Sequence, residues 1–159
     1  NMEMPIPHDN SNIVSSWDVL NGQEVTGDCV VIGGGLVGAE TAEYLANKGH
    51  QVTIVEMMDK IAAGESTTVL PLMMKDFADH NVKQLVNTKV DHIENNIVYT
   101  ANEQIKADTI INALGSKKNI FDDSSITIPH VYVGDCSGER TADIASAIRT
   151  AYHAANEIG

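Results

Sequence analysis

The sequence predicts an α/β fold with a parallel sheet, helices packed on it and an inserted antiparallel β-meander. An apolar run at 29–34 ends in glycine, a helix-forming segment follows at 36–50, and a second apolar run follows at 51–56. Strand, helix and strand in this order form a βαβ unit, whose strands are parallel. Short alternating segments between 83 and 106 predict the meander.

We expect a linker arm over residues 1–26, because this stretch is polar and rich in turn-forming residues, and it can hold a short helix at 16–21. The run at 29–34 is continuous and β-branched, which is typical of a strand buried on both faces. The helical segment at 36–50 carries alanine and leucine on one face, and Gly49 stands where glycine commonly ends a helix.

A second helix is predicted at 67–81, with Ser66 or Thr67 as its cap and Pro71 early enough to be tolerated. The meander follows, with Asn95–Asn96 as one of its turns. Its four predicted segments are 83–86, 89–94, 97–101 and 104–106.

Two further strands are predicted at 107–115 and 130–134, joined by a loop at 116–129. A long helix at 140–159 closes the chain, and its apolar residues recur at helical spacing. This stripe consists of Ile144, Ala147, Ile148, Ala151 and Ala155.

The formal net charge of the 159-residue chain is -12, which argues against a nucleic-acid or anionic-membrane surface. It does not argue against an anionic cofactor, because backbone N–H groups bind phosphate without basic side chains. Cys29 and Cys136 lie far apart and the histidines are scattered, so we predict no metal site. We also assign no catalytic residue to this chain. No apolar stretch approaches the roughly 20 residues that span a bilayer, and we expect a cytoplasmic location.

The strongest motif is G-x-G-x-x-G at Gly33, Gly35 and Gly38, between the first strand and the first helix. Gly33 permits a tight turn, Gly35 lets a pyrophosphate approach the backbone, and Gly38 lets the helix pack close to the strand. The helix start would direct the N–H groups of Leu36 and Val37 at the phosphates. This context makes the predicted fold Rossmann-like and its ligand a dinucleotide.

Glu56 ends the second strand, where an acid accepts the ribose hydroxyls of adenosine. A 2′-phosphate about 4 Å away would cost roughly 4 kcal/mol at an effective dielectric of 20. We therefore expect NAD(H) in preference to NADP(H). Met57 is a candidate contact beside the adenine, with loop or core filling as the alternative.

Four stretches and the Ala-rich final helix resemble the C-terminal half of two-dinucleotide flavoproteins. The stretches are SSWDVLNGQ, VVIGGGLVGAETAEYLANKGHQVTIVE, TIINALGSKKN and IPHVYVGDC. The resemblance is strongest to the NADH:flavin oxidoreductases built on an old-yellow-enzyme barrel, namely 2-enoate reductase and 2,4-dienoyl-CoA reductase. It implies an NADH-binding domain at 27–115 and the C-terminal segment of a split FAD-binding domain at 116–159.

The same resemblance implies roles for three more residues. Gly115 would lie near the nicotinamide end of NADH, and Gly134 and Asp135 would lie on the flavin side of FAD. Hydride would pass from NADH to FAD, and onward through an iron–sulfur centre to FMN and an activated C=C bond. FMN and the iron–sulfur cluster would be bound by the parent enzyme and not by this chain.

Several parts of such an enzyme are missing from the sequence, which has one glycine fingerprint, no cysteine cluster and no length for a barrel. We therefore interpret the chain as a fragment that is inactive alone and lacks the FAD and barrel domains of its parent. The strand at 130–134 would join the fragment's own sheet or mediate a homodimer. Alternatives are the NADH domain of a disulfide reductase, ferredoxin reductase or NADH oxidase, and a non-catalytic ADP- or AMP-binding module.

Overall fold

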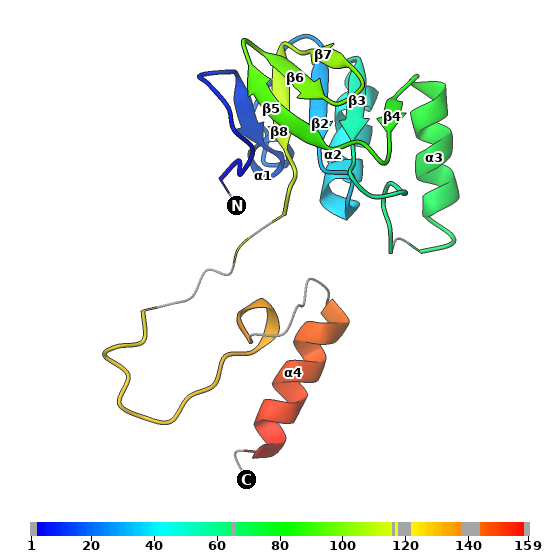
Figure 1. Cartoon of the computed structure of the whole chain (residues 1–159). Coiled ribbons are helices and arrows are strands. Elements are labelled where there is room, and N and C mark those ends of the chain that lie inside the picture. Colours follow the sequence, from blue (N-terminus) through cyan, green and yellow to red (C-terminus); the bar gives the residue numbers. More distant parts are fainter. Residues whose placement is uncertain (1–2, 65, 116, 118–121, 138–143, 158–159) are drawn as a thin grey trace. The chain divides into compact units, whose positions relative to one another are not determined.

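A computed structural model describes residues 3–64, 66–115, 117, 122–137 and 144–157 of the chain. The chain forms two compact units, Asn1–Ser116 and Lys117–Gly159, and each is considered by itself (Figure 1). No described helix has both the length and the apolar character needed to cross a membrane.

The first unit is built on a five-stranded sheet in the order β1-β8-β2-β3-β4, and every neighbouring pair is parallel (Figure 1). The strands are β1 (Ile13–Ser15), β2 (Cys29–Ile32), β3 (Val52–Val55), β4 (Lys83–Leu85) and β8 (Thr109–Asn112). A three-stranded antiparallel meander consists of β5 (Val90–Glu94), β6 (Ile97–Thr100) and β7 (Gln104–Lys106). The predicted fold class, a Rossmann-like α/β fold with a meander, is confirmed.

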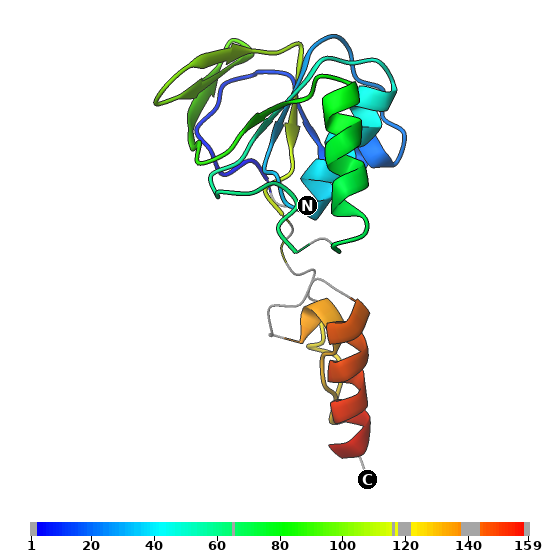
Figure 2. The same cartoon turned by 90° about the vertical axis from the view of Figure 1, so that its right-hand side faces the viewer.

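The parallel sheet is covered on both faces, by helices on one and by the meander on the other (Figure 2). The helices are α1 (Ser16–Leu20), α2 (Leu36–Asn47) and α3 (Leu70–Asp79). Because side chains alternate along a strand, Val31 packs with the helices, whereas Val30 and Ile32 pack with the meander. Burial on both faces explains why β2 is a continuous apolar run.

Residues 1–26 contribute an edge strand that was not predicted. β1 pairs with β8 in parallel register, with Ile13 opposite Ile110. A three-residue strand has too few positions for a periodicity, so only its tertiary pairing reveals it. The short helix expected at 16–21 is present as α1, with the Ser15 hydroxyl accepting a hydrogen bond from Trp17 N at its start.

Helix α3 begins at Leu70, later than the predicted start at 67, and it follows a turn over 67–69. Pro71 lies in its first turn, and the cap position belongs to Val69, whose side chain makes no capping bond. Ser66 still contributes, because its hydroxyl accepts a hydrogen bond from Val69 N at 3.2 Å.

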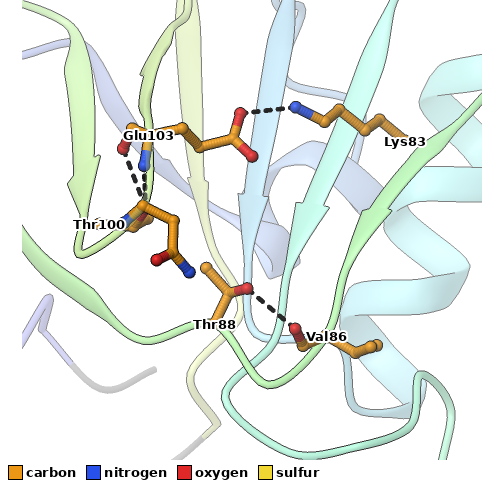
Figure 3. Close-up of polar contacts among 6 residues, drawn as sticks. Lys83, Val86, Thr88, Thr100 and Glu103 are labelled. Carbon is orange, nitrogen blue, oxygen red and sulfur yellow. Dashed lines mark hydrogen bonds and ion pairs between the residues drawn. The ribbon is translucent and has the colours of Figure 1, made fainter.

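The segment at 83–85 belongs to the parallel sheet as β4, so its assignment to the meander was wrong. The turn at Asn95–Asn96 is confirmed, since both residues have left-handed φ angles of 53° and 58°. Lys83 on β4 forms an ion pair of 2.6 Å with Glu103 in the β6–β7 turn (Figure 3). Thr100 accepts a hydrogen bond from Glu103 N and donates one to Glu103 O, which fixes that turn.

The second unit contains a 3₁₀ turn, η1 (Gly134–Cys136), and the helix α4 (Ile144–Glu157). The prediction of a strand at 130–134 was wrong, because residues 130–133 form no strand and Gly134 begins η1. Strand conformation requires a neighbouring strand for its backbone groups. The described polar contacts here are instead local: Asp123 Oδ2 accepts from Tyr132 Oη at 2.6 Å and contacts His130 Nε2 at 2.7 Å.

Helix α4 leaves much of its predicted apolar stripe in solvent. The side chains of Ile144 and Ile148 are 80% and 64% exposed, respectively. The one buried residue of the helix is Thr150, whose hydroxyl accepts a hydrogen bond from Gly134 N at 2.9 Å. The described part of this unit therefore has an apolar helix face that it does not cover itself.

Candidate functional site

The turn between β2 and α2 depends on glycine at two of the predicted positions. Gly33 has a left-handed φ of +101°, and a Cβ atom there would lie 2.6 Å from the carbonyl oxygen of Ala113. A Cβ atom at Gly38 would overlap the carbonyl oxygen of Gly33 and lie 3.1 Å from Ala113 Cβ. Gly33 thus permits the tight turn, and Gly38 permits the close packing of helix α2 against the strand, as predicted.

Gly35 differs from its two neighbours in the motif. Its backbone is extended, with φ -63° and ψ -175°, so any residue could adopt it. A Cβ atom added there would meet nothing within 4 Å, and Gly35 is exposed. Glycine here therefore preserves open space at the start of α2, where a ligand could approach the backbone.

The start of α2 presents backbone donors to that open space. Gly35 is the N-cap residue and makes no side-chain cap hydrogen bond. The first four N–H groups of an α-helix have no partner within the helix, and they carry a partial positive charge. In α2 these groups include the N–H of Leu36 and Val37, so the predicted phosphate-facing residues stand at the position that suits an anion.

Glu56 follows β3 directly and is only 9% exposed. Its Oε2 accepts a hydrogen bond from Gly34 N at 2.6 Å, and its Oε1 accepts one from Met58 N at 2.7 Å. The acid predicted from spacing alone thus touches the glycine turn. Bonds from two N–H groups stabilise a carboxylate that is largely removed from water.

The motif itself assigns no role to Gly34, although this residue lies inside it. Its carbonyl oxygen accepts a hydrogen bond from Ala62 N at 2.7 Å. A Cβ atom at Gly34 would lie 2.5 Å from Ile61 Cδ1 and 3.0 Å from Glu56 Cβ. The run of three consecutive glycines was the available signal that this position, too, is sterically restricted.

Two exposed methionines follow the acid. Met57 is 64% exposed and Met58 is 58% exposed, and Leu36 at the helix start is 39% exposed. All three side chains are thus exposed to solvent and do not fill the core. Met57 therefore does not fill the core. It lies in the loop after β3, which is the other half of the alternative interpretation, and its contact with the adenine stays a prediction.

Strand β8 brings a third segment to the same edge. Because β8, β2 and β3 are parallel neighbours, their carboxyl ends lie together, which is where ligands bind in such sheets. Ala113 N donates a hydrogen bond to Ile32 O at 2.9 Å, beside Gly33. Gly115 ends this segment with a φ of +102° and is exposed. The structure thus places Gly115 after the strand that neighbours the glycine turn.

Gly134 and Asp135 lie in the second unit, where they begin η1. Gly134 has a left-handed φ of +64° and donates its N–H to Thr150 on α4. Asp135 is exposed on the same turn. Their predicted relation to a flavin stays a prediction.

The buried cysteine, Cys29, gives no sign of being a nucleophile. Burial raises the pKa of the Cys29 thiol to about 11, assisted by the negative charges of Asp28 and Asp108. Such a thiol stays protonated near neutral pH and is unreactive. Within the described part of the chain, no group of three or more His, Cys, Asp and Glu side chains could hold a metal ion.

Comparison with known proteins agrees with this geometry. The chain is 44% identical to a bilirubin reductase of Mediterraneibacter gnavus over 96% of its own length, and 31% identical to a cinnamate reductase of Clostridium sporogenes over 92%. A solved 2-naphthoyl-CoA reductase superposes with a TM-score of 0.76 and 27% identity over 94% of the chain. The chain spans only 24%, 23% and 24% of these three proteins, respectively.

A family profile decides the classification. The profile of the pyridine nucleotide-disulphide oxidoreductases matches residues 3–157, nearly the whole chain. The match includes the glycine turn, Glu56 and the segment that ends at Gly115. The chain belongs to the pyridine nucleotide-disulphide oxidoreductase family.

Proposed function

We propose that this chain is the NAD(H)-binding module of a flavin-dependent oxidoreductase. The observation that carries the proposal is the open space at Gly35, at the helix start of α2 and next to Gly34, whose N–H donates to the Glu56 carboxylate. The two parts of the site suit the two parts of an adenosine diphosphate, with backbone donors for the pyrophosphate and an acid for the ribose. Gly33 and Gly38 shape the turn, whereas Leu36, Val37 and Met57 would contact the ligand.

The cofactor supplies the chemistry, which is transfer of a hydride from the nicotinamide to FAD in the parent enzyme. The residues of this chain bind and orient NADH, and none of them is assigned a catalytic role. Gly115 would border the nicotinamide end, since it follows the strand beside the glycine turn. Because the chain spans about a quarter of its relatives, we expect no turnover from the chain alone.

Glu56 supports a preference for NAD(H) over NADP(H). A carboxylate that is 9% exposed is poorly screened by water, so a second negative charge nearby is unfavourable. Two like charges about 4 Å apart repel by roughly 4 kcal/mol at an effective dielectric of 20. Even half of this energy corresponds to a discrimination of more than about tenfold.

The second unit, residues 116–159 in our division of the chain, is proposed to be the returning segment of a split FAD-binding domain. Its compactness apart from the first unit supports this division. The exposed side chains of Ile144 and Ile148 suit a surface that other parts of the parent cover. Gly134 and Asp135 would then contribute to the flavin side of FAD.

The parent is proposed to reduce an activated C=C bond. Two relatives are named as reductases of bilirubin and cinnamate, and both of these compounds contain conjugated C=C bonds. The compound in the name of the solved structure, 2-naphthoyl-CoA, contains a conjugated ring system. The higher identity to the bilirubin reductase, 44% against 31%, makes a large conjugated substrate the first to test. FMN, an iron–sulfur cluster and a barrel would belong to the rest of the parent.

Calorimetric titration of the purified chain with NADH, NADPH and ADP tests the binding function. We expect NADH to bind more tightly than NADPH by more than about tenfold. We also expect NADH to bind more tightly than ADP, because the Gly115 segment adds contacts to the nicotinamide half. Equal affinity for NADH and ADP would favour an ADP- or AMP-binding module, and no binding of either would refute the proposal.

A further inference from the structure

The peptide group of Gly34 is held by the segment that follows β3. Its N–H donates to Glu56 Oε2 at 2.6 Å, and its carbonyl oxygen accepts from Ala62 N at 2.7 Å. Ile61, which is 7% exposed, fills the space where a Cβ atom of Gly34 would stand. Both the N–H and the carbonyl oxygen of Gly34 are therefore hydrogen-bonded, and Ile61 leaves no room for a larger residue at this position.

Glu56 connects this peptide to the loop that follows it. While Oε2 holds Gly34, Oε1 accepts a hydrogen bond from Met58 N at 2.7 Å. Bonds from N–H groups to an ionised carboxylate are stronger than neutral ones, and low exposure strengthens them further. One side chain thus joins the glycine turn to the loop over residues 57–62.

We infer that Glu56 is a positioning residue for the phosphate-binding turn as well as a contact for the ribose. By fixing the peptide of Gly34, its carboxylate sets the direction in which the chain enters Gly35 and the first N–H groups of α2. This inference rests on the proposed function, because it takes the ligand of that turn to be a pyrophosphate.

The two roles are compatible. An ionised carboxylate offers about four acceptor positions on its two oxygens. Gly34 and Met58 occupy one position on each oxygen, which leaves one on each for the two ribose hydroxyls. Turning the carboxylate away from a 2′-phosphate would break both backbone bonds, so the positioning role also keeps the negative charge in place.

The test uses a ligand that has no ribose. If Glu56 contacts only the ribose, Glu56→Gln should not weaken the binding of inorganic pyrophosphate. Loss of a nearby negative charge should, if anything, strengthen the binding of an anion. If Glu56 positions the turn, the same variant should weaken it, because a glutamine side chain has one acceptor oxygen for two N–H donors. The two interpretations thus predict changes of opposite sign in the pyrophosphate affinity of Glu56→Gln.

The experiment compares the wild-type chain with Glu56→Gln, Glu56→Ala and the control Glu40→Gln. Glu40 is exposed on α2, so its replacement removes the same charge without removing a bond to the turn. Calorimetry gives the affinities for pyrophosphate and NADH, and NMR hydrogen exchange follows the amides of Gly34 and Met58. The Gln variant keeps the size of the side chain, so the test remains available if the Ala variant does not fold.

We expect Glu56→Gln to lower pyrophosphate affinity at least about fivefold and to speed exchange of the Gly34 or the Met58 amide at least about tenfold, as loss of a charged hydrogen bond predicts. Glu40→Gln should leave the pyrophosphate affinity and the amide exchange rates within about twofold of the wild-type values. Unchanged amide exchange, or pyrophosphate affinity that is unchanged or higher in Glu56→Gln, would overturn the inference. If the wild-type chain binds neither ligand while Glu56→Gln still speeds exchange, the proposed function fails and the positioning of the turn stands.

Discussion

Replacing Gly38 by alanine tests the steric argument for the glycine turn. The added Cβ would overlap the carbonyl oxygen of Gly33 and approach Ala113 Cβ at 3.1 Å. A backbone carbonyl and an alanine methyl cannot rotate away, so the backbone itself must shift. Overpacking costs about 1–3 kcal/mol, and a forced backbone shift belongs to the upper half of that range. Alanine is favoured over glycine inside a helix by about 1 kcal/mol, which leaves a net loss of about 1–2 kcal/mol.

Gly35→Ala is the matched comparison, because its Cβ would enter open space. We expect a loss of only about 0.5 kcal/mol, from a poorer N-cap residue. NADH affinity should nevertheless fall at least about tenfold in this variant, because the methyl group occupies the approach of the pyrophosphate. Gly38→Ala should therefore mainly lower the free energy of unfolding, whereas Gly35→Ala should mainly lower the affinity for NADH.

The single tryptophan of the chain, Trp17, lies on α1 in the first unit and provides the assay. Its fluorescence during urea unfolding gives the free energy of unfolding of that unit, and calorimetry gives the NADH affinity. A Gly38→Ala chain as stable as wild type would refute the steric argument. A Gly35→Ala chain that binds NADH as tightly as wild type would refute the placement of the pyrophosphate.

Three other predictions concern the core and the titrating groups. Phe77→Ala should lower the free energy of unfolding by about 3–5 kcal/mol in urea melts, since Phe77 is fully buried. Cys29 should react with a thiol reagent at pH 8 only after denaturant is added, because its pKa is raised to about 11. The Ile128 carbonyl and the Asp123 carboxylate raise the pKa of His130, so their stabilising effect should be present below pH 6.5 and disappear as the pH rises through the raised pKa. In an NMR titration, Asp123→Asn should lower this pKa.

The glycine turn was predictable because its signals are local. Gly33, Gly35 and Gly38 have fixed spacing, and the acid at Glu56 follows from the length of a βαβ unit. The bonds that join Glu56 to Gly34 and Met58 were not predictable, because they depend on how the loop after β3 folds back. Motif spacing therefore identified the residues but not the contacts between them.

Tertiary context also explains why two predicted strand assignments were wrong. The segment at 83–85 alternates like a meander strand, but it pairs with β3 and lies in the parallel sheet. The segment at 130–134 has the composition of a strand, yet the described part of its unit offers no strand beside it. Propensity describes what a segment can form, and its neighbours decide whether it does.

The pairing of β1 with β8 determines where this protein can be shortened. Ile110 N donates to Asn12 O at 2.9 Å, and the Asn12 amide donates to Asp108 O, so the stretch before Gly27 is hydrogen-bonded to β8 and to the residue just before it. A recombinant version beginning at residue 27 would strip the outer side of β8 and leave its amides open to strand addition by another molecule. Samples prepared for crystallography or screening should therefore begin upstream of Asn12.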